Sequence, residues 1–199
     1  MLMSAGLPNS KQIYIHGFIS VNGQKISKSL GNVVDPYALV KTYGTDAVRY
    51  YLLREIPSYD DGDYSERRFK ELYNADLANG LGNLAARVAK LCETNRVTVE
   101  ESTKPPPLSY KNHMDLFEFN LALDDIWQYI RQLDVQVNND EPWKLNTEEA
   151  TKRLVTYIPT IRSIGYKLQP FLPETAGKIL EQFKGPTIKA QSPLFPRIT

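Results

Sequence analysis

The chain has 199 residues, of which 42% are hydrophobic and 24% charged, the mixture of a globular protein rather than of a disordered or membrane chain. Lysine and arginine number 24 against 23 aspartates and glutamates, so the net charge of +1 gives no overall basic field for nucleic acid, and any RNA contact must be local. The single cysteine, Cys92, excludes an intrachain disulfide and a cysteine-rich zinc site and fits a reducing, cytoplasmic setting. We expect no signal peptide and no membrane helix, because a basic leader and a long apolar run are both missing.

The first third of the chain predicts a compact mixed segment. Residues 12–21, QIYIHGFISV, alternate partly and are rich in isoleucine and aromatic residues, which predicts a strand. A polar loop with a glycine on either side follows. The segment VVDPYALVKTYG then predicts a short helix with Asp35 as N-cap, Pro36 at the first helical position and Gly44 as the stop. Thr45 is the expected cap of the next helix.

The segment SYDDGDYS is too polar and turn-rich for a helix and predicts a turn with a brief strand. From Ser65 the apolar period becomes helical, which predicts one long amphipathic helix over SERRFKELYNADLANGLGNLAARVAKLCETN, residues 65–95. The proline run in TKPPPLSY predicts a linker between helices, because consecutive prolines cannot continue a helix. A second long helix is expected over roughly 111–138, with Leu116, Phe119 and Trp127 in its apolar stripe.

Two further helices complete the prediction. Thr147 is the expected cap of a third long helix, which ends at Pro170, and a shorter helix runs from Pro173 to Gly185. Each helix has one apolar stripe, so the fold class is mainly α, an antiparallel helical bundle preceded by a small mixed α/β segment. The expected divisions are 1–64, 65–185 for the bundle, and 186–199 for a coil that packs Leu194 and Phe195 on the helices.

The stretch KISKS, residues 25–29, suits a polyphosphate ligand. Lysine is a compact charge, and serine hydroxyls and backbone amides in a glycine-flanked turn add donors without bulk. In phosphoryl or nucleotidyl transfer, a protein mostly positions groups and stabilises developing negative charge, which Lys25 and Lys28 are equipped to do. A solvated lysine and serine loop is the alternative interpretation of these five residues taken alone.

The wider string HGFISVNGQKISKSLGNVVDP resembles the second signature of class I aminoacyl-tRNA synthetases, the KMSKS loop, with Ile26 in place of methionine. The resemblance implies that the loop closes over ATP, with Mg²⁺, during amino-acid activation. It implies catalytic roles for Lys25 and Lys28 on the triphosphate, and an ATP site formed by His16, Lys25, Ser27, Lys28 and Ser29. A strand histidine satisfied by a backbone carbonyl is the alternative interpretation of His16.

The rest of the chain resembles methionyl-tRNA synthetases, on YGTDAVRYYLLREIPSYDDGDYS and NADLANGLGNLAARV. The first 64 residues then correspond to the last strand of a nucleotide-binding fold and a stem-contact segment, and the bundle to a class Ia anticodon-binding domain. The resemblance implies that methionine tRNA, with anticodon CAU, is bound by Asn83, Arg87 and Trp143. Residues 83 and 87 lie four apart, on one helix face, and a tryptophan can stack on an unpaired base. A solvated helix face and a core tryptophan are the alternatives.

The resemblance also indicates what lies outside these residues. No His-Ile-Gly-His type signature is present, since the only histidines are His16 and His113. We therefore expect a C-terminal portion whose partner is the N-terminal catalytic half of the same enzyme, outside these residues. The portion alone should not activate methionine, and no side-chain metal site is expected in it. A homodimer is left open. The alternatives are a stand-alone tRNA-binding module with a vestigial loop, or the same portion of an isoleucine- or valine-specific synthetase.

Overall fold

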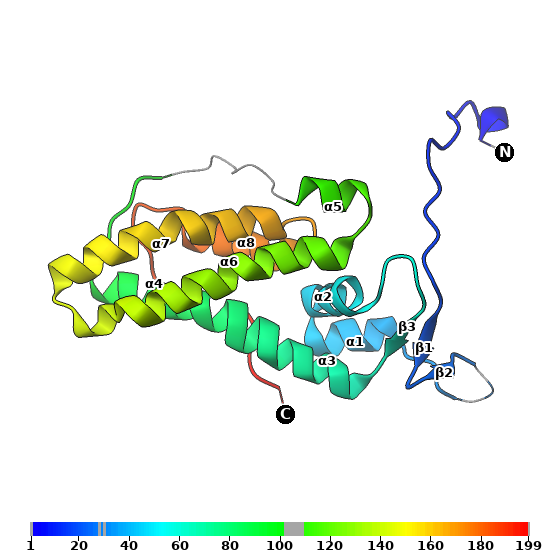
Figure 1. Cartoon of the computed structure of the whole chain (residues 1–199), viewed down its shortest axis with the longest axis horizontal. Coiled ribbons are helices and arrows are strands. Elements are labelled where there is room, and N and C mark those ends of the chain that lie inside the picture. Colours follow the sequence, from blue (N-terminus) through cyan, green and yellow to red (C-terminus); the bar gives the residue numbers. More distant parts are fainter. Residues whose placement is uncertain (1, 28, 30, 102–109, 199) are drawn as a thin grey trace.

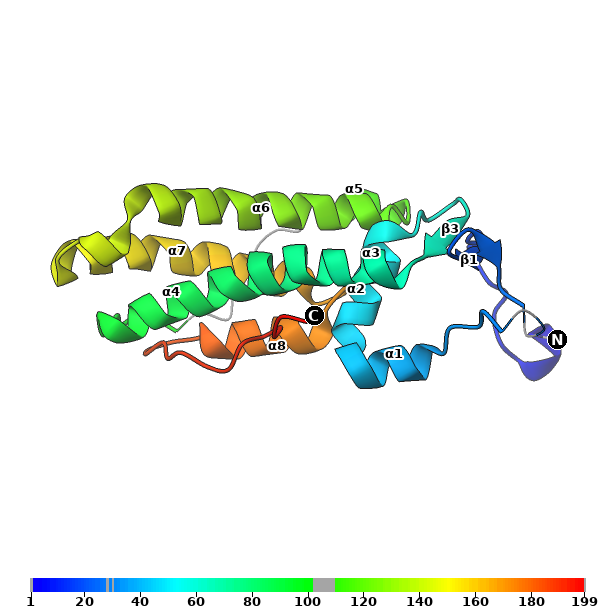
Figure 2. The ribbon, with the colours of Figure 1, turned by 90° about the horizontal axis from the view of Figure 1, so that it is seen from below.

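The computed structural model describes residues 2–27, 29, 31–101 and 110–198. Long helices lie lengthwise beside one another, with a small sheet and the N-terminal segment at one end (Figures 1 and 2). Over the described residues the chain is therefore mainly helical with one three-stranded sheet. This confirms the predicted mainly α class with a small mixed α/β part.

The sheet has the strand order β2-β1-β3. Strand β1 (Ile19–Val21) pairs antiparallel with β2 (Gln24–Lys25) and parallel with β3 (Gly62–Tyr64), the brief strand expected in SYDDGDYS. The ten-residue strand predicted over 12–21 is wrong over most of its length. In the part of the chain described, residues 12–18 have no partner strand, and Ile13, Ile15 and Phe18 are 77%, 78% and 82% exposed.

Helices α1 (Pro36–Tyr43) and α2 (Thr45–Glu55) follow the loop. The Asp35 side chain accepts a hydrogen bond from the Tyr37 amide at 2.9 Å, and Gly44 has a φ of 86°, so the predicted start and stop of α1 are confirmed. The predicted cap by Thr45 is wrong, because Gly44 takes the N-cap position of α2 without a side-chain bond.

The predicted long helix after Ser65 is confirmed as three consecutive helical stretches, α3 (Glu66–Leu72), a π-helical stretch (Tyr73–Gly82) and α4 (Asn83–Thr94). The Ser65 hydroxyl accepts from the Arg68 amide and caps its start. A Cβ on Gly82 would lie 2.9 Å from the Leu77 carbonyl oxygen, so the wider π turn requires glycine there. Periodicity alone did not predict this widening, because a π turn shifts the apolar stripe by only one residue.

The helix predicted over 111–138 is two helices, α5 (Lys111–Asp115) and α6 (Phe119–Asp140). They meet at a corner where Phe117 has a φ of 56° and Leu116 is 57% exposed, so the inward position expected for Leu116 is wrong. The apolar pattern continues across this corner because Phe117 and Phe119 pack on residues outside the helices.

Helix α7 (Thr147–Leu168) and helix α8 (Pro173–Gln182) complete the chain of helices. The cap of α7 is Asn146, whose side chain accepts from the Glu149 amide at 2.9 Å, so the predicted cap by Thr147 is wrong by one residue. Helix α8 ends three residues before Gly185. The C-terminal coil packs as predicted, with Phe195 buried and its ring edge-on to Tyr73 at 5.8 Å.

The core runs through the helices and reaches the sheet. The Trp127 ring of α6 lies 4.6 Å from the Tyr50 ring of α2, which joins the middle of the helical region to the sheet end. The apolar stripe of α7 is buried, namely Leu154, Ile158, Ile161, Ile164 and Leu168. Each such residue removes apolar surface from water, which contributes about 25 cal/mol per Å². No described helix is long and apolar enough to cross a membrane.

Candidate nucleotide loop and nucleic-acid interface

The hairpin that carries the lysine loop is fixed by its turn and by a carboxylate. Asn22 and Gly23 both have positive φ, 51° and 74°, as a two-residue turn with the right twist for a hairpin requires. The Asp63 carboxylate of β3 accepts hydrogen bonds from the Ser20 hydroxyl at 2.6 Å and the Gly23 amide at 2.7 Å. The turn before the loop is therefore held at a defined place on the sheet.

The loop after β2 is braced by one asparagine. The Ser27 amide donates to Asn32 Oδ1 at 2.8 Å, and Asn32 Nδ2 donates to the Lys25 carbonyl at 3.0 Å. The Ser27 and Ser29 hydroxyls lie 2.8 Å apart. Lys28, predicted as catalytic, lies outside the described residues. Asn32 was not predicted as part of this site, although its place seven residues after Lys25 suits an amide that closes a short loop.

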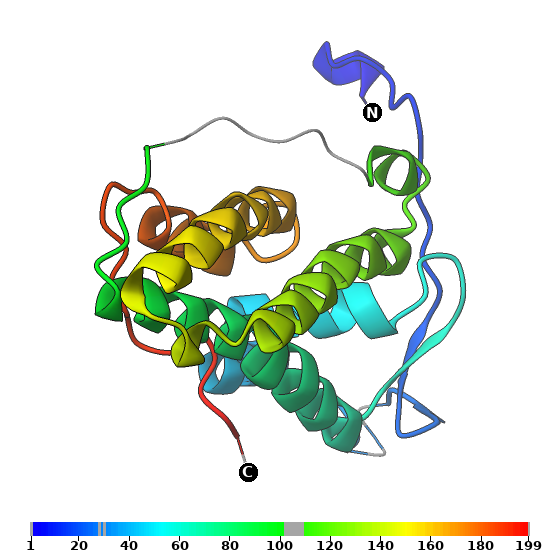
Figure 3. The ribbon, with the colours of Figure 1, turned by 60° about the vertical axis from the view of Figure 1, so that its left-hand side comes forward.

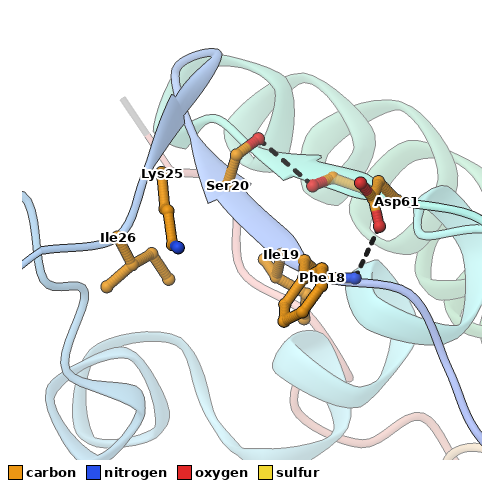
Figure 4. A pocket seen from close by; sticks show the side chains of 7 residues that line it. Phe18, Ile19, Ser20, Lys25, Ile26 and Asp61 are labelled. Atoms are coloured by element: carbon orange, nitrogen blue, oxygen red, sulfur yellow. Dashed lines mark hydrogen bonds between the residues drawn. The ribbon is translucent and has the colours of Figure 1, made fainter.

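Lys25 and Ile26 line one side of a shallow depression, and Phe18, Ile19, Ser20, Asp61 and Gly62 line the rest (Figure 4). The Phe18 amide donates to Asp61 Oδ1 at 2.7 Å. Lys25 is exposed and forms no salt bridge with any described carboxylate. The ammonium group is thus available to an anion, on a floor that is largely apolar.

His16 lies apart from Lys25. Its exposed ring has Nδ1 2.7 Å from the Gly17 carbonyl, and it lines a neighbouring depression with Tyr14, Leu52 and Pro57. The carbonyl contact agrees with that part of the alternative interpretation, although His16 lies outside β1, and the ATP role stays a prediction. Gly17 itself is required, because a Cβ there would lie 2.1 Å from the Asp60 carbonyl oxygen.

At the opposite end of the helices, Arg87 is held by α6. Its two terminal nitrogens donate to Asn138 Oδ1 at 2.7 Å and to Asp134 Oδ1 at 2.8 Å. Asn138 in turn donates to Asp134 at 3.1 Å. The guanidinium group is therefore fixed by two side chains one helical turn apart. Neither was predicted, although their spacing of four places them on one helix face.

Trp143 stands beside this arginine in the 3₁₀ turn Pro142–Lys144. The centre of the Arg87 guanidinium group lies 5.9 Å from the centroid of the tryptophan ring, within the range of a cation–π contact. Trp143 is 47% exposed, so it is not a core residue. Asn83 is exposed at the first position of α4, one turn before Arg87. The structure brings Arg87 and Trp143 into contact and places Asn83 on the same helix.

The basic residues near the start of α3 are paired. Arg67 contacts Glu71 at 2.5 Å, Arg68 contacts Glu55 at 2.7 Å, and Lys70 contacts Glu66 at 3.5 Å. Each of these three basic side chains is therefore engaged by a carboxylate on the helix surface. Over the described residues, no group of three or more histidine, cysteine, aspartate or glutamate side chains is arranged to hold a metal ion.

Comparisons with known proteins place the chain among the aminoacyl-tRNA synthetases. Residues 1–89 match the family model for class I tRNA synthetases (M). The chain is therefore a relative of the class I aminoacyl-tRNA synthetases. Within that class its relatives are methionyl-tRNA synthetases. It is 38% identical to the methionine–tRNA ligase of Brucella melitensis over 96% of the chain, and 37% identical to that of Thermotoga maritima over 92%.

Solved structures similar to the chain are also methionyl-tRNA synthetases. The chain superimposes with a TM-score of 0.81 and 32% identity on Mycobacterium tuberculosis methionyl-tRNA synthetase in complex with methionyl-adenylate, over 98% of the chain. The apo form of that enzyme gives a TM-score of 0.79 at 29% identity. The chain spans 40% and 32% of the length of the two ligases, and 46% of each solved chain.

Proposed function

We propose that this chain works as the C-terminal portion of a methionine–tRNA ligase, in which its helices recognise the tRNA anticodon and its hairpin supplies the KMSKS-type loop. The observation that carries the proposal is the contact of Arg87, fixed by Asp134 and Asn138, with the half-exposed ring of Trp143. Unpaired RNA bases are recognised by stacking on aromatic faces and by hydrogen bonds to their edges. An ordered guanidinium group beside an exposed indole offers both.

In this proposal the long helices form the anticodon-binding bundle of the class. Trp143 stacks on one anticodon base, while Arg87 and Asn83 donate hydrogen bonds to base edges. The guanidinium group loses little further freedom on binding, because the two α6 side chains already order it. Methionine tRNA with the anticodon CAU is the proposed partner, since the relatives named above are methionine–tRNA ligases.

The loop has a separate role in the proposed reaction. The methionine carboxylate attacks the α-phosphate of ATP, which forms methionyl-adenylate and releases pyrophosphate, and the methionyl group is then transferred to tRNA. Lys25 and Lys28 stabilise the negative charge that grows on the triphosphate, and the loop amide and hydroxyl groups bind its oxygens. Mg²⁺ bound to the ATP phosphates would neutralise part of their charge, beside the ammonium groups of Lys25 and Lys28.

Anticodon preference tests the proposal directly. The 199-residue chain should bind a methionine tRNA transcript more tightly than the same transcript with its CAU anticodon changed, and the preference should be lost in Arg87→Ala. Equal binding of both transcripts by the unaltered chain would overturn anticodon recognition. A preference for an isoleucine or valine anticodon would support the alternative specificity.

A second measurement separates this proposal from a stand-alone module with a vestigial loop. The enzyme that joins this chain to a nucleotide-binding half should catalyse methionine-dependent ATP–pyrophosphate exchange, and the 199-residue chain should give only background. Exchange that does not change when Lys25 and Lys28 are both replaced by alanine would show that the loop has no catalytic role.

A further inference from the structure

Four aromatic side chains from three distant segments meet at the corner between α5 and α6. The Tyr14 ring stacks on Phe117, with centroids 4.8 Å apart and planes 20° from parallel. The rings of Tyr59 and Phe119 stand edge to face with the Tyr14 ring, with centroids 5.5 Å and 6.4 Å from its centroid. Such offset and edge-on pairs are the favourable arrangements of aromatic rings. We call the set Tyr14, Tyr59, Phe117 and Phe119 the aromatic clamp.

Two hydroxyl groups of the aromatic clamp form hydrogen bonds to the backbone of neighbouring segments. The Tyr14 hydroxyl donates to the Ser58 carbonyl, and the Tyr59 hydroxyl donates to the Leu116 carbonyl at 2.7 Å. Each tyrosine is therefore bonded to the backbone of another segment. The N-terminal segment, the loop after α2 and the α5–α6 corner are thereby tied to one another. Figure 3 shows the N-terminal segment passing beside α5.

The corner itself is strained. Phe117 has a φ of 56°, a conformation that a bulky side chain rarely adopts and that persists only when its surroundings hold it. The Phe117 amide donates to the Met114 carbonyl at 3.1 Å, and the Glu118 amide to the His113 carbonyl at 2.8 Å. A straight helix over 111–138, which the sequence pattern permits, would not place the Phe117 ring against Tyr14.

The aromatic clamp stands between the two candidate sites. Tyr14 lies five residues before β1, whose hairpin partner ends at Lys25. Phe119 begins α6, and Asp134, which holds Arg87, lies 15 residues further along that helix, about 22 Å at 1.5 Å per residue. Along residues 11–16, Tyr14 is the residue that is partly buried, while its neighbours are exposed.

We propose that Tyr14 and Phe117 are positioning residues for adenylate formation, which fix the segment leading to β1 and the lysine loop on the corner between α5 and α6. The inference rests on the proposed function. Displacement of the reacting groups by about 1 Å can lower a rate by about 100-fold, even when the altered residue lies far from the chemistry. In this role the clamp holds the segment in place and contributes no group to the reaction.

The test uses the enzyme that joins this chain to its nucleotide-binding half. In Tyr14→Ala and in Phe117→Gly, kcat for methionine-dependent ATP–pyrophosphate exchange should fall about tenfold or more. The affinity for methionine tRNA should stay within about twofold, because Arg87 and Trp143 lie at the other end of α6. Phe117→Gly removes the ring while glycine accepts the left-handed backbone, so the corner keeps its course.

Two matched variants complete the experiment. Tyr14→Phe keeps the stack and loses only the bond to Ser58, so it should recover most of the rate. Tyr37→Ala removes an 84% exposed tyrosine of α1 and should leave the rate unchanged. A Tyr14→Ala rate within twofold of the unaltered enzyme, or a parallel loss of rate, tRNA affinity and thermal stability, would overturn the positioning role. Absence of exchange in the unaltered enzyme would instead overturn the proposed function, and the positioning role with it.

Discussion

The guanidinium group of Arg87 lies 5.9 Å from the ring centroid of Trp143, and Asp134 and Asn138 of α6 hold its two terminal nitrogens. The arginine thus reaches across from α4 to α6 while the indole beside it stays 47% exposed. A base that stacks on this ring meets a donor that is already ordered, which lowers the entropy lost on binding.

Trp143→Ala should weaken binding of methionine tRNA by about 1 to 3 kcal/mol, the usual contribution of one base–aromatic stack. Thermal stability should change little, because the side chain is half exposed. Binding titrations with labelled tRNA measure the effect. Trp143→Phe is the matched control, since it keeps an aromatic face and should recover most of the affinity. Unchanged affinity in the alanine variant would mean that the exposed ring meets no base.

Asp134→Ala should weaken tRNA binding only while Arg87 is present. The ion pair is partly exposed, with side chains 27% and 43% accessible, so its own contribution to stability is about 0.2 to 1 kcal/mol. Its larger effect is to order the guanidinium group. In a double-mutant cycle, Asp134→Ala should add nothing to the affinity already lost in Arg87→Ala. Additive losses would show that Asp134 acts independently of the arginine.

Asn32→Ala should lower kcat for adenylate formation in the enzyme that contains this chain, by about tenfold, because the loop loses both bonds that fix its base. The KM for ATP should change less, since the lysine charges remain. Asn32→Asp is the informative control. It can still accept from the Ser27 amide but cannot donate to the Lys25 carbonyl, so an intermediate rate is expected. Equal changes in kcat and KM for the alanine variant would contradict a positioning role for Asn32.

Local sequence signals predicted the elements whose ends are set by their own residues. Asp35, Pro36 and Gly44 define α1 because a side-chain cap, a fixed φ and a left-handed stop all act within a few residues. The buried stripe of α7 followed from its period for the same reason. The cap of α7 is Asn146, one residue before the predicted Thr147. Both are good capping residues, and the geometry of the helix start selects one of them.

Features that depend on contacts between distant segments were not predicted. The α5–α6 corner is one, because Leu116 and Phe119 fit one continuous helical stripe, and the packing of Phe117 and Phe119 against Tyr14 depends on a segment about 100 residues away. The hold of Asp134 on Arg87 is another, since 47 residues separate them in the chain. For the candidate site, spacing placed Asn83 and Arg87 on one helix face, but no local signal placed Trp143 beside Arg87.

Cys92 gives a prediction that depends on pH. It is fully buried in α4, and burial raises the pKa of its thiol to about 12, so the native protein holds almost no thiolate at pH 8. Iodoacetamide should therefore alkylate it slowly, and the rate should rise in urea together with the loss of helical circular dichroism. Rapid alkylation of the native protein at pH 8 would show that the helices open around α4.

The raised pKa of the Cys92 thiol also determines how the free energy of unfolding changes at alkaline pH. The unfolded thiol titrates near its ordinary value of 9.0, below the folded value, so above about pH 9 the unfolded state binds fewer protons than the folded state. Stability therefore falls as the pH rises from 9 toward 12. Urea unfolding of the unaltered chain and of Cys92→Ala at pH 8 and pH 10.5 measures this. The loss of unfolding free energy between the two pH values should be smaller in Cys92→Ala, because the alanine variant has no thiol to ionise; an equal loss would assign the alkaline change to other groups.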